Sequence, residues 1–128
     1  MYSVIAITQE SRCRRESETR EVIACWQEEF GLLDWKVECH PISIFQVSDE
    51  YCRVGKNFVG ISRDFDRKVG TIHHTRKLTE EDIVHELLHV RYPQWSEDQV
   101  NTETIHLLKE KQDEILRRER KKKYRGRR

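Results

Sequence analysis

The chain has 128 residues, of which 37% are charged and 36% hydrophobic, and its net charge at pH 7 is +1. This length fits one domain, and the clustered, periodic apolar residues exclude a disordered chain. No apolar run approaches the ~20 residues of a membrane span, so we expect none. The short apolar stretch Val4–Ile7 follows no basic residue, so we expect no secretory signal. We therefore expect a cytoplasmic protein.

Apolar periodicity and turn residues predict the elements in chain order. They are a short strand over 2–8, a helix over 18–30 stopped by Gly31, strands at Trp35–Cys39, 58–65 and 68–75, a helix from about 80 to Tyr92, and a last helix that begins after Ser96. Strands and helices are segregated, which favours an α+β fold. We predict a small three- to four-stranded sheet with a backing helix, followed by two helices.

The starts of the last two helices carry capping signals. Thr79 is followed three residues later by Asp82, and Ser96 is followed three residues later by Gln99. Both patterns resemble the capping box, in which two side chains satisfy the backbone N–H groups of a helix start. Pro93 ends the first of these helices.

Residues 85–89 read His-Glu-Leu-Leu-His, an HExxH sequence. Two histidines four residues apart lie on one face of a helix, so both imidazoles reach one zinc ion, and Glu86 lies near a water on that metal. At ~100° per residue, Ile83, Leu87 and Val90 form an apolar face, and the two histidines point the other way together with Asp82 and Glu86. A chance HExxH on a solvated helix is the competing interpretation, and the cap and the apolar face disfavour it.

A catalytic zinc site needs a third protein ligand and an open position for water. The sequence after His89 lacks the Gly and His of the HExxHxxGxxH pattern, so the ligand is expected from the following helix. Its candidates are Glu97, Glu103, His106 and Glu110. Glu103 borders the apolar stripe, where an unpaired carboxylate is costly; His106 ranks second, and Glu97 ranks lower because it follows a short turn.

HExxH followed by a helix that carries Glu103 resembles the gluzincin class of zinc metallopeptidases, and the small size is similar to the soluble minigluzincins. The resemblance covers roughly residues 68–108. It implies Zn²⁺ held by His85, His89 and Glu103, with Glu86 as the general base in peptide-bond hydrolysis. It also implies that the strand over 68–75 is an edge strand that pairs with an extended peptide or protein substrate.

A donor to the oxyanion completes the expected mechanism. Tyr92, three residues after His89, and His106 are the candidates. An ordinary interfacial role for Tyr92 is the alternative interpretation.

The C-terminal residues 117–128 contain nine Lys/Arg and one Glu, whereas the rest of the chain has a net charge of −7. We therefore divide the chain into one metallopeptidase-like domain, 1–116, and a basic tail, 117–128. The charge of this tail favours binding to nucleic acid. One alternative is a solvated end without a partner. Another is a segment that folds onto the acidic body and blocks the expected active-site cleft. The alternative to a peptidase is a non-catalytic, metal-stabilised protein that binds nucleic acid through this tail.

Overall fold

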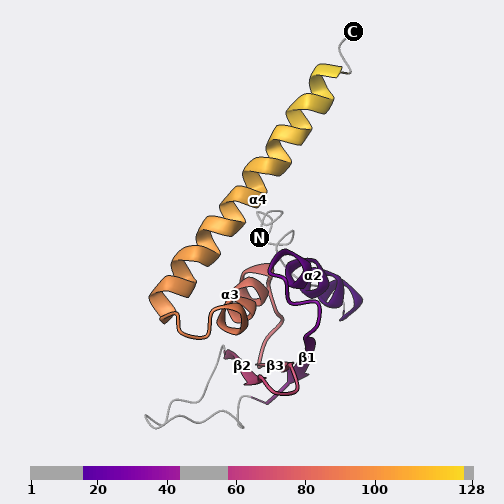
Figure 1. The fold of residues 1–128 in the computed structure, drawn as a ribbon. Helices are drawn as coiled ribbons and strands as arrows, with labels where there is room; N and C mark the ends of the chain where they lie inside the picture. The colour runs from indigo at the N-terminus through magenta and orange to yellow at the C-terminus, as the bar shows by residue number, and fades with distance from the viewer. Residues whose placement is uncertain (1–15, 44–57, 126–128) are drawn as a thin grey trace. The chain divides into compact units, whose positions relative to one another are not determined.

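The computed structural model describes residues 16–43 and 58–125. Its elements are α2 (Glu16–Glu29), β1 (Lys36–Pro41), β2 (Val59–Asp64), β3 (Val69–His74), α3 (Glu80–Arg91) and α4 (Glu97–Arg125) (Figure 1). They fall into two compact units, one ending at Gln94 and the other beginning at Trp95. The predicted α+β class is confirmed, and the strand predicted over 2–8 lies outside the described residues.

The three described strands form a mixed sheet in the order β1-β3-β2. β1 runs parallel to β3, with Lys36 opposite Val69, and β2 runs antiparallel to β3, with Val59 opposite His74. The expectation that the strand over 68–75 is an edge strand is wrong. A tight turn pairs β3 with β2 on one side while β1 pairs on the other, so the outer edges of the described sheet belong to β1 and β2.

Two residues in the left-handed region mark the ends of elements. Gly31 has φ of +68° directly after α2, which confirms that it stops the helix, because a residue without Cβ adopts this conformation at little cost. Lys68 has φ of +56° in the turn between β2 and β3, where Asp64 Oδ1 also accepts the backbone N–H groups of Asp66 and Arg67, both at 3.1 Å. Local turn chemistry therefore fixes this hairpin.

The core of the first unit lies between the sheet and its two helices. α3 packs against both α2 and β2 (Figure 1). Ile72 of β3 and Ile83 and Leu87 of α3 have no exposed surface, and burying such a side chain stabilises the fold by roughly 1.5–3 kcal/mol each. Trp26 of α2 donates from Nε1 to Glu80 Oε2 at 2.7 Å and so ties α2 to the first turn of α3.

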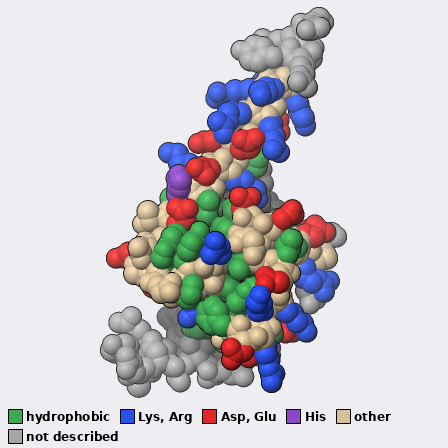
Figure 2. All heavy atoms as spheres, viewed as in Figure 1, with side chains coloured by type: hydrophobic (Ala, Val, Ile, Leu, Met, Phe, Trp, Pro, Cys, Tyr) green, Lys and Arg blue, Asp and Glu red, His purple; other side chains and the backbone are tan. Residues whose placement is uncertain are grey.

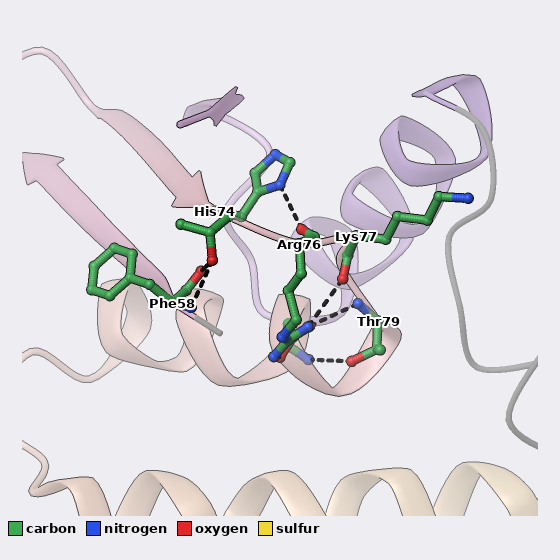
Figure 3. A network of polar contacts seen from close by, with 7 residues as sticks. Phe58, His74, Arg76, Lys77 and Thr79 are labelled. Atoms are coloured by element: carbon green, nitrogen blue, oxygen red, sulfur yellow. Dashed lines mark hydrogen bonds and ion pairs between the residues drawn. The ribbon is translucent and has the colours of Figure 1, made fainter. Parts of the chain in front are cut away.

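The start of α3 is fixed by the predicted capping box and by an added ion pair (Figure 3). Thr79 Oγ1 accepts the N–H of Asp82 at 3.2 Å, and Asp82 Oδ2 accepts the N–H of Thr79 at 2.8 Å. Arg76 donates to both carboxylate oxygens of Asp82, at 2.6 and 2.9 Å. Burial opposes the charged form, but these bonds outweigh it and lower the pKa of Asp82.

We expect Asp82→Asn to destabilise the protein by about 1–2 kcal/mol at neutral pH, because a bidentate, charge-assisted contact is lost. The folded-state pKa is depressed, so this stabilisation is present above the unfolded value of about 3.9 and disappears as the pH falls through the folded pKa. Urea unfolding of both proteins between neutral and acidic pH measures the difference.

The control is Thr79→Ala, which removes the Thr79 hydroxyl while leaving Arg76 beside Asp82. It is expected to cost about 1 kcal/mol. A stability difference between wild type and Asp82→Asn that stays constant down to strongly acidic pH would contradict this account.

The second unit is the helix α4, which begins with the second predicted capping box. Gln99 donates its N–H to Ser96 Oγ at 3.2 Å, and Ser96 donates its N–H to Gln99 Oε1 at 2.9 Å. Val100 and Thr104 are buried, and the helix then continues through the basic residues to Arg125. Lys and Arg side chains gather toward its C-terminal end (Figure 2).

Two further features concern the membrane and the cysteines. Within the described residues, no helix combines the length and the apolar character required to cross a bilayer. Cys25 and Cys39, the two cysteines that lie in the described ranges, form no disulfide. Cys13 and Cys52 lie outside those ranges.

Candidate metal centre

The two histidines of HExxH lie side by side on α3, as the helical spacing predicts. His85 Nε2 and His89 Nε2 are 3.2 Å apart, and the two rings meet edge to face with centroids 4.9 Å apart. Both side chains are half-buried. Ile83, Leu87 and Val90, on the apolar face of the same helix, are at most 3% exposed, which explains why the histidines are turned away from the core.

The separation of the Nε2 atoms fits a shared cation. Zinc binds imidazole nitrogen at about 2.0–2.1 Å, so two nitrogens on one tetrahedral zinc lie about 3.3 Å apart. The observed 3.2 Å matches this value without a change of rotamer. Without a cation, one of the two Nε2 atoms must carry a proton and donate it to the other. With a cation between them, both Nε2 atoms bind it through their lone pairs. The two imidazoles are therefore placed to share one metal cation.

Glu86 lies between the two histidines in sequence but is only 6% exposed. From helical spacing, Glu86 was expected with the histidines on the polar side of α3. The structure instead buries it at the boundary with the apolar face, where Val90, one turn further along, is also buried. A buried carboxylate requires polar partners, and Glu86 has such contacts in the structure. Burial restricts its rotamers beside the histidine pair.

A residue of β2 fixes the turn of α3 that carries His89. The carbonyl of His89 would normally accept the N–H of residue 93, but Pro93 has none. Arg63 Nη1 donates to this carbonyl at 2.7 Å. The guanidinium also lies 5.6 Å from the centre of the Phe65 ring. Arg63 therefore satisfies a carbonyl that the proline leaves open and positions His89 relative to the sheet.

We expect Arg63→Ala to weaken zinc binding about three- to tenfold, since one exposed hydrogen bond to the His89 carbonyl is lost. Competition with a chromophoric chelator measures the affinity. Arg67→Ala is the matched control, because Arg67 lies in the neighbouring turn and its contact with Asp64 is a long 4.0 Å. Equal effects of the two substitutions would show that Arg63 does not position His89.

Glu97, one of the third-ligand candidates, lies at the start of the second unit. It is the first residue of α4, as predicted, and lies eight residues after His89. From the sequence, Glu97 ranked below Glu103 as a ligand because it follows a short turn.

The other third-ligand candidates contact one another on the surface of α4. His106 Nδ1 lies 3.4 Å from Glu103 Oε1, and His106 Nε2 lies 3.2 Å from Glu110 Oε1. Glu103 also lines a shallow hollow with Trp95 and Asp98. Glu103 is six residues from Glu97, about 9 Å along a helix and ~120° around it. One ion therefore cannot take both carboxylates as ligands.

Tyr92 forms the C-terminal cap of α3. Its N–H donates to Leu88 O at 2.8 Å, and the guanidinium of Arg91 lies 4.9 Å from the centre of its ring.

The role of Arg63 was not predicted from the sequence. The proline four residues after His89 was the available signal for an unpaired carbonyl, but nothing in the sequence identifies which strand supplies the donor.

Comparison with known proteins gave no relatives. The chain matches no protein-family model, no curated protein and no solved structure. The candidate metal centre therefore stands on its own residues and geometry.

Proposed function

We propose that this protein is a zinc-dependent metallopeptidase. The observation that carries the proposal is the pair of Nε2 atoms of His85 and His89, 3.2 Å apart on one face of α3. The burial of Glu86 between them in the same helix supports a base held beside that pair. Two imidazoles that bind a metal, with the Glu86 carboxylate beside them as a base, are the groups that metal-assisted amide hydrolysis uses.

We propose Glu97 as the third ligand, because it supplies a carboxylate at the first position of α4, eight residues after His89. Glu103, the expectation from the resemblance to gluzincins, is the alternative. A zinc ion held by these residues would supply Lewis-acid chemistry toward water and a substrate carbonyl. Three protein ligands rather than four would be typical of a catalytic rather than a structural zinc site.

In the proposed reaction, Glu86 accepts a proton from the attacking water and then delivers it to the nitrogen of the leaving amine. Its restricted side chain supports this role, since proton transfer depends on a fixed position. We propose Tyr92 as the donor to the oxyanion because it follows His89 by three residues at the helix end. His106 is the second candidate for this donor.

The direct test is hydrolysis of a mixture of unstructured, fluorescently quenched peptides by the full chain. Cleavage is expected to fall to background after zinc is removed with a chelator and to return with added Zn²⁺ but not Mg²⁺, because imidazole ligands favour zinc. The absence of cleavage by zinc-loaded protein across the mixture would contradict the peptidase. We also propose a cytoplasmic location, which is the expectation from the sequence.

A second candidate function rests on the end of α4. Six of the seven residues from Arg117 to Lys123 are basic, and all seven are exposed. We propose as the alternative a non-catalytic protein whose metal stabilises the fold and whose basic helix end binds nucleic acid by neutralising phosphate charge. Salt-dependent binding of duplex DNA or RNA, together with no peptide cleavage, would favour this function over the first.

A further inference from the structure

α4 carries an apolar stripe beyond its buried first turns. Ile105, Ile115 and Leu116 are 63%, 42% and 46% exposed, respectively, and Leu108 is half-buried. At ~100° per residue these four side chains fall within about 100° of arc on one side of the helix. An apolar stripe of this width on an exposed helix is typical of a surface that packs against another helix.

The charges of α4 are divided between its two halves. From Glu97 to Glu110 the helix has four acidic residues and one basic residue, whereas from Lys111 to Arg125 it has eight basic and three acidic residues. A parallel partner with the same sequence would bring the basic ends together and repel. An antiparallel partner with the same sequence would place each acidic half against a basic half.

We propose that α4 pairs with α4 of a second copy of this chain, antiparallel, about a twofold axis near residues 110 and 111. In that register Ile105 faces Leu116 of the other copy, and Asp98 faces Lys123 of the other copy. Lys109 and Asp113, which flank the stripe on one side, come opposite one another across the pair. In an antiparallel helix pair each flank meets the equivalent flank of its partner, so these contacts occur twice.

The self-complementary pattern favours a second copy over other partners. A polyanion such as nucleic acid would bind the basic half but leave the apolar stripe and the acidic half uncovered. A membrane surface would require basic and apolar residues along one length of helix. Here the apolar residues end at Leu116 and the basic run begins at Arg117. Only an antiparallel copy covers all three features.

The test is sedimentation equilibrium of the full chain at low salt, with and without a zinc chelator. We expect a reversible dimer in both conditions, because the contact lies outside the candidate metal centre. Ile105→Asp is expected to weaken the dimer about tenfold or more. Helicity by circular dichroism confirms that each variant folds. A chain that remains monomeric at all concentrations would overturn the proposal.

A charge swap tests the antiparallel register independently of the apolar stripe. Asp98→Lys and Lys123→Asp should each weaken the dimer, since each places like charges opposite one another. The double variant should restore it. The two positions are 25 residues apart on one helix, so restoration cannot come from a contact within one chain.

Failure of the double variant to recover dimerisation would overturn this register. Monomeric protein whose binding to duplex DNA is lost in Lys123→Asp would also overturn the proposal, and would assign the basic half of α4 to nucleic acid instead.

Discussion

Replacement of Glu86 by glutamine is expected to reduce peptide hydrolysis by about 100- to 10,000-fold while zinc stays bound. The amide keeps the size and hydrogen-bonding capacity of the side chain at a site that is only 6% exposed, so the packing of α3 should persist. It cannot accept the proton of water at neutral pH. The loss should therefore appear in kcat, with a smaller change in KM.

The matched control is Glu81→Gln, an exposed glutamate in the first turn of the same helix. It removes the same charge from α3 without touching the histidine pair, and its activity should stay near that of wild type. Steady-state kinetics on one cleaved peptide, with zinc content measured on the same samples, separates the outcomes. Activity retained in Glu86→Gln with zinc bound would show that Glu86 is not the general base.

Glu97→Ala is expected to weaken zinc binding by at least about 100-fold, whereas Glu103→Ala should leave it nearly unchanged. Glu97 is the proposed third ligand, at the start of α4. Glu103 is engaged on the surface of α4 with His106, 3.4 Å away. Losing a direct ligand removes one of three protein bonds to the ion, so the effect should exceed that of Arg63→Ala.

His106→Ala completes the comparison, because His106 ranked second among the ligands expected from the sequence. Chelator competition at constant pH gives all three affinities relative to wild type. A large loss in Glu103→Ala alone would restore the ligand implied by the resemblance to gluzincins. A large loss in His106→Ala alone would indicate a site with three histidines.

The parts of the molecule that were predictable from the sequence depend on local interactions. The capping boxes at Thr79 and Ser96 were predicted because their partners are three residues away. The pairing of His85 with His89 follows from helical spacing alone. Gly31 was identifiable as a helix stop because its role depends only on backbone conformation.

The parts that were not predictable depend on contacts between distant segments. The edge position expected for the strand over 68–75 was wrong because the parallel pairing of β1 with β3 joins residues more than thirty positions apart, and no local signal specifies it. The Arg63 contact with His89 spans 26 residues. Burial of Glu86 was missed because a helical wheel shows which side a residue faces but not how deeply neighbouring elements cover it.

The central claim is that His85 and His89 bind one zinc ion. The most direct test is metal content by mass spectrometry on full-length protein purified without chelator or an affinity metal, for wild type and His89→Ala. We predict about one zinc per wild-type chain and near-background zinc in His89→Ala, with both proteins folded. Wild-type protein without zinc, even after zinc is added back and excess removed, would contradict the account.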